Sequence, residues 1–217
     1  MRFTDFFRSR RLFLQVVARL VAIVTIAGVA SLVGLYVVYS KTLPSSNQLS
    51  SRNPNEATRI FDRNGVLLYE IHGDEKRVVV PSDAIATVMK QASIAIEDER
   101  FYQHRGIDFR GIARAFYRNY ITQEGMEGGS TITQQLARNA YITRSRTFDR
   151  KIREMFLAWR IERKLSKDQI LTMYLNEIGY GANAYGVEAA SQMYFGKAAR
   201  DLSLSEAATL AAVTKSP

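Results

Sequence analysis

The sequence predicts a mainly α-helical domain that follows one N-terminal transmembrane helix and a small β segment. An uncharged apolar run lies near the start, two short β-type runs flank an Asn-Gly dipeptide, and a three- to four-residue apolar period begins after Pro81. The 217 residues suffice for one domain with its own core and an appendage. With 47% hydrophobic and 24% charged residues, an intrinsically disordered chain is excluded.

The apolar run is long enough to cross a bilayer. Leu20–Tyr39 holds no charge, and twenty helical residues cover roughly 30 Å. Residues 20–40 are the predicted anchor. Arginines precede the run and only Lys41 directly follows it, so the positive-inside rule places residues 1–19 in the cytoplasm and the chain after residue 40 outside it. A cleaved signal peptide with small residues near Ala30 is the alternative.

Residues 41–57 are rich in Ser, Asn and Pro and are expected to form a linker. Residues 58–80 are expected to form the β segment. Asn64-Gly65 favours a tight hairpin turn between two β-type runs, Thr58–Phe61 and Val66–Glu70. Arg77–Val80 is a candidate third strand.

Residues 81–217 are expected to form the helical domain, which the chain holds in C-terminally truncated form. The apolar residues of its first helix recur on one face: Ile85, Val88, Met89, Ala92 and Ile96. Further helices are expected at 109–121, 131–140, 148–165, 167–178, 187–194 and 204–213. Capping pairs mark three starts, namely Thr131 with Gln134, Ser166 with Gln169 and Ser203 with Glu206. The core side of the helix from Phe148 is expected to hold Phe148, Ile152, Met155, Phe156 and Trp159.

Composition restricts the chemistry. There is no cysteine, and the two histidines, His72 and His104, form no H-E-x-x-H motif, so thiolate chemistry and histidine-rich metal sites are excluded. Catalysis must use carboxylates, hydroxyls and cations. The net charge of +9 favours an anionic partner such as phosphate, nucleic acid or a membrane surface. Because the domain is expected outside the membrane, nucleic acid is not an expected partner.

Three stretches carry candidate chemistry. In the first, three consecutive acids (Glu97, Asp98 and Glu99) close an apolar helix, where a carboxylate beside aromatic residues can gain the character of a general base. The simpler interpretation is a solvated helix end.

The second stretch runs from Gly128 to Gln135. Its glycines allow close backbone approach, and the helix start behind them offers N–H groups, hydroxyls and amides to a sugar or phosphate. The alternative is a well-capped helix after a flexible loop.

The third stretch, Arg138 to Lys167, holds ten basic residues and three acids. Arginine suits phosphate because its guanidinium donates two parallel hydrogen bonds. Arg146, Arg150 and Arg153 recur at helical spacing, and Glu154 is either an ordinary ion-pair partner or a carboxylate held ready by cations.

Together these motifs resemble glycosyltransferase family 51, the peptidoglycan glycosyltransferase domain of class A penicillin-binding proteins and monofunctional transglycosylases. The resemblance covers about Arg59 to Pro217 and rests on five ordered motifs: EDERFYQHRG at 97–106, GGSTITQQLARN at 128–139, RKIRE at 150–154, KDQILTMYLNEIGYG at 167–181 and AASQMYFGK at 189–197. It implies a lysozyme-like helical fold with an amphiphilic jaw that dips into the membrane.

The resemblance also implies an activity: polymerisation of lipid II into glycan strands, with inversion and release of undecaprenyl pyrophosphate. Glu97 is then the general base, and Glu154 is the second carboxylate, acting directly or through a divalent ion such as Mg²⁺ or Mn²⁺. The implied substrate-binding residues are Asp98, Phe101, His104, Ser130, Thr133, Gln134, Gln135, Arg138, Asn139, Arg146 and Arg153. The implied partners are lipid II, the growing glycan strand, membrane lipid and other cell-wall synthesis proteins, at the cytoplasmic membrane.

Two features bear on this resemblance. Arg138 stands where the family often has lysine, and the chain stops where family members continue. The sequence holds no S-x-x-K or K-T-G motif, so no penicillin-sensitive transpeptidase lies in these residues. The hairpin-like stretch before the first motif is typical of two-domain class A proteins.

The alternative functions are a non-catalytic membrane-tethered scaffold that binds lipid-linked glycans and a glycan hydrolase that uses the same acids.

Overall fold

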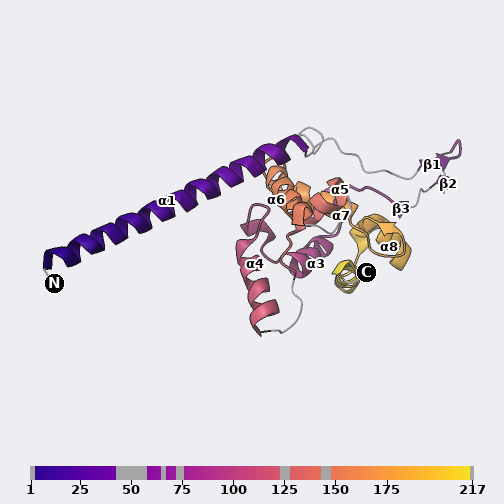
Figure 1. The fold of residues 1–217 in the computed structure, drawn as a ribbon. Helices are drawn as coiled ribbons and strands as arrows, with labels where there is room; N and C mark the ends of the chain where they lie inside the picture. The colour runs from indigo at the N-terminus through magenta and orange to yellow at the C-terminus, as the bar shows by residue number, and fades with distance from the viewer. Residues whose placement is uncertain are drawn as a thin grey trace. The chain divides into compact units, whose positions relative to one another are not determined.

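The computed structural model describes residues 3–42, 58–64, 67–71, 76–122, 128–142 and 148–215 (Figure 1). The chain divides into two compact units, one ending at Leu43 and the other beginning at Pro44. Each unit is described by itself.

The first unit is a single helix, α1 (Phe3–Thr42). Its stretch Gln15–Tyr39 has 25 residues and a mean hydropathy of 2.4, which makes it long and apolar enough to cross a membrane. At 1.5 Å per residue it spans roughly 37 Å. Large apolar side chains such as Val24 and Ile26 are exposed along it. The predicted N-terminal helix of transmembrane length is therefore present, whereas its orientation stays a prediction.

The second unit begins with the predicted β hairpin. Strands β1 (Thr58–Phe61) and β2 (Leu67–Ile71) pair antiparallel, with a register shift between Ile60 and Phe61. The backbone N–H of Asn64 donates to Oδ1 of Asp62 at 2.8 Å, as expected for an Asx turn.

The candidate third strand does not join this hairpin. Strand β3 (Lys76–Arg77) instead pairs parallel with β4 (Ala184–Tyr185). The side chain of Arg77 fixes this pairing, because it is buried, forms an ion pair with Glu177 and lies over the ring of Tyr185. A buried guanidinium needs such partners to offset its lost hydration.

Helices make up the rest of the second unit. They are α3 (Thr87–Glu97), α4 (Phe109–Phe116), α5 (Ile132–Tyr141), α6 (Phe148–Glu162), α7 (Lys167–Glu177), α8 (Val187–Phe195) and α9 (Leu204–Lys215). A π-helical segment, Tyr117–Thr122, extends α4, and 3-10 turns lie at Ser82–Ala84, Phe101–Gln103 and Ala199–Asp201. The predicted helical domain is confirmed, with element boundaries within a few residues of those expected.

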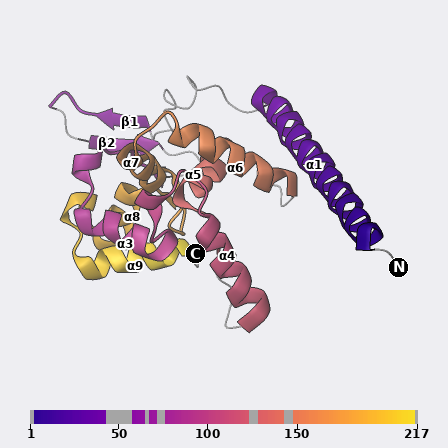
Figure 2. The same ribbon diagram turned by 90° about the vertical axis from the view of Figure 1, so that its left-hand side faces the viewer.

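Two groups of packed helices form the core. Helix α9 lies against α3, and α5 packs on both α6 and α7 (Figure 2). The largest fully buried side chains come from these helices and the segments that join them; they include Met89, Phe101, Ile132, Leu136, Leu157, Tyr174 and Tyr180.

The three predicted helix caps are present. The side chain of Thr131 accepts a hydrogen bond from the backbone of Gln134, and Ser166 forms a complete capping box with Gln169. Oε2 of Glu206 accepts from both the backbone N–H and the hydroxyl of Ser203. Each cap contributes about 1 kcal/mol and fixes where its helix starts.

The predicted core face of α6 is wrong. Ile152, Met155, Phe156 and Trp159 are only half-buried, whereas the buried residues are Glu154, Leu157, Ala158 and Ile161. The side chain of Phe148, which also belonged to the predicted face, lies outside the described part of the chain. The buried set recurs at three- and four-residue steps, and a carboxylate belongs to it because cations accompany Glu154 inside the domain.

We predict that Gly186→Ala destabilises the fold more than Gly196→Ala does. Both glycines have positive φ, +83° and +67°. A Cβ at Gly186 would lie 2.8 Å from the carbonyl oxygen of Asn176, whereas one at Gly196 would meet nothing within 4 Å. Backbone strain alone costs about 1–2 kcal/mol, so Gly186→Ala is expected to cost about 3 kcal/mol or more. Thermal melting of both variants measures the difference, and equal melting temperatures would contradict it.

Candidate functional site

A cleft of about 730 Å³ contains the first predicted carboxylate, Glu97. It lies among the end of α3, helix α4, the start of α5 and the end of α9. Five of the predicted site residues line it: Glu97, Asp98, Ser130, Gln135 and Arg138. The cleft therefore brings together residues from the first two motifs.

Glu97 is the last residue of α3, and neutral groups hold both of its carboxylate oxygens. Nε2 of Gln135 donates to Oε2 at 2.5 Å, and Oγ1 of Thr214 lies 3.1 Å from Oε1. Gln135 lies one turn into α5, and Thr214 lies near the end of α9. Three helices distant in sequence thus meet at this one side chain.

Two buried tyrosines lie near Glu97. Burial raises the pKa of Tyr174 well above its ordinary value, and repulsion from Glu97 adds to this effect. Burial and then the charge of Glu97 also raise the pKa of Tyr180. Both phenols therefore stay protonated at physiological pH and do not compete with a carboxylate as proton acceptors.

Asp98 makes internal contacts, although it also lines the cleft. Its Oδ2 accepts from the backbone N–H of Ile132 at 3.1 Å, and its Oδ1 lies 2.9 Å from Nε2 of His104. The carboxylate of Asp98 binds the N–H of Ile132 in the first turn of α5, and the hydroxyl of Thr131 binds the N–H of Gln134. These two N–H groups are among those expected to bind an anion, and they are already used within the domain. A role of Asp98 in binding substrate stays a prediction.

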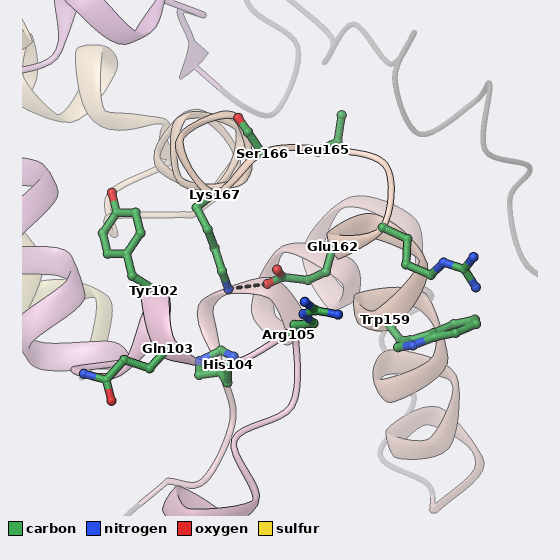
Figure 3. A pocket seen from close by; sticks show the side chains of 10 residues that line it. Tyr102, Gln103, His104, Arg105, Trp159, Glu162, Leu165, Ser166 and Lys167 are labelled. Atoms are coloured by element: carbon green, nitrogen blue, oxygen red, sulfur yellow. Dashed lines mark hydrogen bonds and ion pairs between the residues drawn. The ribbon is translucent and has the colours of Figure 1, made fainter.

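Phe101 and His104 lie inside the domain. Phe101 is fully buried, with Nζ of Lys167 4.3 Å from its ring centre. His104 is 8% exposed and lines a second cavity of about 770 Å³, whose lining does not include Glu97 (Figure 3). These contacts make both residues part of the support around the first motif.

Four of the ten residues that line the second cavity bind one another in pairs. Lys167 forms an ion pair with Glu162 at 2.7 Å (Figure 3). Arg163 stacks on Trp159, with its guanidinium carbon 4.8 Å from the ring centre. The predicted site residue Thr133 also belongs here, because its hydroxyl donates to Glu162 at 2.6 Å. We therefore take the cleft at Glu97 as the candidate active site.

Glu154 is buried and does not line the cleft. Its carboxylate forms ion pairs with Nε of Arg150 at 3.1 Å and Nζ of Lys151 at 3.2 Å. Lys151 also donates to the hydroxyl of Ser130 at 2.7 Å and to Oε1 of Gln134 at 3.1 Å. Glu154 is thus connected to the cleft through Lys151 and Ser130.

These surroundings do not fit a divalent ion at Glu154. Two cations already share its carboxylate, so a further positive ion would be repelled. Among the described residues, no group of three or more His, Asp or Glu side chains lies close enough to hold a metal.

The remaining predicted cations differ in place. Arg138 lines the cleft, and its Nε lies 3.4 Å from Oδ1 of the exposed Asn139. Arg153 binds Asp149 at 2.6 Å on the surface of α6. Arg146 lies outside the described residues.

Some residues at the site were not predicted. Arg114 of α4 and Arg118 of its π-helical extension line the cleft, and their spacing with Gly111 places all three on one helix face. That spacing is a signal in the sequence. Thr214 carries no such signal, because it reaches Glu97 only through the packing of α9 on α3.

A mainly helical domain with an acidic residue and several arginines around one cleft is the structure that the sequence motifs led us to expect. The family described as Transglycosylase matches residues 64–217, and the chain belongs to this family. The lysozyme-like fold class expected from the motifs is thereby confirmed.

Known relatives are penicillin-binding proteins. The chain is 46% identical to penicillin-binding protein 1A of Aquifex aeolicus over 94% of this chain and 28% of that protein. It is 40% identical to penicillin-binding protein 1A of Rickettsia bellii over 92% of this chain and 25% of the relative. For penicillin-binding protein 1F of Bacillus subtilis the identity is 39%, over 97% and 28%. The chain therefore spans about a quarter of the length of the curated relatives it matches.

We predict that Asp98→Ala destabilises the domain, whereas Glu99→Ala does not. Removing the Asp98 carboxylate leaves the N–H of Ile132 and the ring of His104 buried without a partner, which costs about 1–3 kcal/mol. Glu99 is exposed, so its loss should change stability by less than about 0.5 kcal/mol. Thermal melting of the two variants separates these cases. A wild-type melting temperature for Asp98→Ala would refute the structural role of the Asp98 carboxylate.

Proposed function

We propose that this chain is a peptidoglycan glycosyltransferase that polymerises lipid II into glycan strands and releases undecaprenyl pyrophosphate. The observation that carries the proposal is the cleft in which Glu97 lies together with Arg114, Arg118 and Arg138. A base and several cations in one cleft suit the transfer of a sugar from a diphosphate to a hydroxyl group.

In the proposed reaction, Glu97 takes the proton of the acceptor's 4-hydroxyl group. The acceptor oxygen then forms a bond to the anomeric carbon of the donor while the bond from that carbon to the diphosphate oxygen breaks. The diphosphate leaves with the bonding electrons, and attack from the opposite face inverts the anomeric centre from α to β. Positive charge placed in advance stabilises the diphosphate as its charge grows.

Arg138 is the proposed partner of the leaving diphosphate, with Arg146 and Arg153 as further cations from the same part of the chain. A guanidinium binds phosphate oxygens through two parallel hydrogen bonds. Ser130 and Gln135 line the cleft and are proposed to contact the donor sugar, as is Asn139 on the next turn of α5.

We assign Glu154 a supporting role. Its burial and its two ion pairs hold Lys151, which in turn binds Ser130 at the cleft and the buried Gln134. Since Glu154 lies beneath the cleft wall, we propose that it places this cation and these polar groups and takes no proton itself. Thr133, Phe101 and His104 support the same region from the other side.

Helix α4 has two faces that suit a lipid-linked substrate. Arg114 and Arg118 line the cleft on one face, and large exposed apolar residues lie on the other: Phe109, Ile112, Phe116, Tyr120 and Ile121. Aromatic residues favour the interface between water and lipid. We propose that this apolar face dips into the membrane and so brings the cleft to lipid II.

The proposed location follows from the same elements. Helix α1 anchors the chain in the cytoplasmic membrane with residues 1–19 inside, and the second unit lies outside. Because the relatives are penicillin-binding proteins of about four times the matched length, we propose that the chain is the polymerase portion of such a protein. The growing glycan strand, membrane lipid and other cell-wall synthesis proteins are its proposed partners.

Glu97→Gln should abolish lipid II polymerisation and leave the fold intact. Glutamine keeps the size of the side chain but cannot accept the proton, and loss of a general base typically lowers the rate by about 10²–10⁴-fold. Gel analysis of glycan products from labelled lipid II measures the effect. Glu99→Gln serves as the control, because Glu99 is exposed and also lines the cleft.

Wild-type activity in Glu97→Gln would reject Glu97 as the base. Binding of lipid II by the wild-type chain without turnover would favour the scaffold function. Shortening of preformed glycan strands without a lipid-linked donor would favour the hydrolase.

Arg114→Ala and Arg118→Ala should weaken use of lipid II, whereas Arg110→Ala should not. Arg110 lies on the same helix, is exposed and does not line the cleft. Loss of one charge-assisted hydrogen bond to a phosphate is expected to lower kcat/KM by roughly tenfold or more. Steady-state polymerisation rates at several lipid II concentrations measure this, and equal effects of all three substitutions would count against a specific cation site.

A further inference from the structure

The carboxylate of Glu97 lies where its backbone surroundings do not favour negative charge. Glu97 is the last residue of α3, so the carbonyl end of this helix lies beside it. The C-terminus of a helix carries partial negative charge and offers acceptors only. Glu97 therefore depends on side chains for its hydrogen-bond donors.

Two side chains supply these donors, and they differ in kind. Gln135 contributes an amide N–H, which always donates. Thr214 has a single hydroxyl proton and two acceptors within hydrogen-bond distance, the backbone oxygen of Ala211 at 2.7 Å and Oε1 of Glu97 at 3.1 Å, and it also interacts with the phenol of Tyr174. Its proton can serve only one of them at a time.

This geometry allows the hydroxyl to respond to the charge of its neighbour. An ionised carboxylate attracts the proton of Thr214 more strongly than a peptide carbonyl does. After Glu97 has accepted a proton, the Thr214 hydroxyl can return to Ala211 by rotation about one bond. No other atom needs to move for the donor to follow the protonation state.

We infer that Thr214 is a positioning residue for Glu97, one whose hydroxyl holds the carboxylate in place before proton transfer and releases it afterwards. The inference rests on the proposed function. Gln135 also positions the carboxylate of Glu97, through its amide hydrogen bond. This role is additional to its proposed contact with the donor sugar.

Other titratable and charged groups lie around Glu97. Arg138 comes from α5, Tyr174 from α7 and Tyr180 from the segment after α7. Arg114 of α4 and Arg118 of its π-helical extension line the cleft. Asp98 and Glu99 follow Glu97 in the chain and Asp108 caps α4; all three line the cleft, as does Arg100, which is paired with Asp108. The arginines stay charged and the tyrosines stay protonated near neutral pH, so they do not titrate in the acid range.

The test compares Thr214→Val, which removes the hydroxyl and keeps the shape, with Thr214→Ser, which keeps the hydroxyl. We expect Thr214→Val to lower kcat for lipid II polymerisation about tenfold, the size expected for one hydrogen bond to a charged group, with little change in KM. The acid limb of its pH–rate profile should move to higher pH, because the carboxylate has lost a donor that favours its charged form. Thr214→Ser should restore both.

Thr209→Val is the matched control. Thr209 lies on the same helix, is exposed, and donates its hydroxyl to the carbonyl of Ser205 at 2.8 Å, so this variant loses a similar helix contact at a residue that does not line the cleft. Its rate and pH profile should equal those of the wild type. A Thr214→Val variant with the kcat and pH profile of the wild type would overturn the inference, as would equal losses in Thr209→Val and Thr214→Val.

A second measurement does not depend on activity. The ¹³C resonance of the Glu97 side-chain carboxyl can be titrated in the full chain and in Thr214→Val, with Glu97→Gln used to assign it. A titration that moves to higher pH in the variant supports the contact, and superimposable curves refute it. If the wild-type chain polymerises no lipid II, the proposed function fails while this titration still decides the role of Thr214.

Discussion

The carboxylate of Asp98 is the interaction on which the cleft depends. Burying an ionised group costs several kcal/mol unless charges or dipoles replace its hydration. Here the N–H of Ile132, the first residue of α5, and the ring of His104 replace it, and in doing so they tie the end of α3 to the start of α5. The next residue toward the N-terminus is Glu97, and this attachment brings it within reach of Gln135 on the first turns of the same helix. A helix cap therefore sets the geometry of the proposed base.

The positive charge of the chain serves two separate purposes in the second unit. Arg150 and Lys151 lie against the buried Glu154, and they stabilise the packing of α6 beneath the cleft. Arg114 and Arg138 line the cleft itself, from α4 and α5. In the sequence these residues form a diffuse excess of cations. In the fold, the cations that pair with the buried Glu154 are structural, whereas the cations that line the cleft can contact an anionic substrate.

Much of the fold could be predicted from the sequence, because apolar period and capping residues act over a few residues. The hairpin at Asn64 and the helix start at Ser166 are examples. The core face of α6 could not be predicted in this way, since the burial of Glu154 depends on cations that neutralise it and on the helices above it. At the site, the position of Glu97 at a helix end was readable from the sequence. Its contact with Thr214 was not, because 117 residues separate the two and only the packing of α9 on α3 joins them.

Glu97 and Glu154, the two carboxylates to which the family resemblance gives catalytic roles, have different surroundings. This difference indicates different roles. Glu154 is buried, forms ion pairs with two cations and does not line the cleft, so its carboxylate does not face a substrate hydroxyl there. Glu97 faces a cleft and receives hydrogen bonds only from an amide and a hydroxyl, each of which leaves a lone pair on its oxygen. Environments that drive two acids apart in this manner are a general means of assigning different roles to identical side chains. A base must meet its proton within hydrogen-bond distance, and of these two carboxylates only that of Glu97 lines a space that a sugar can enter.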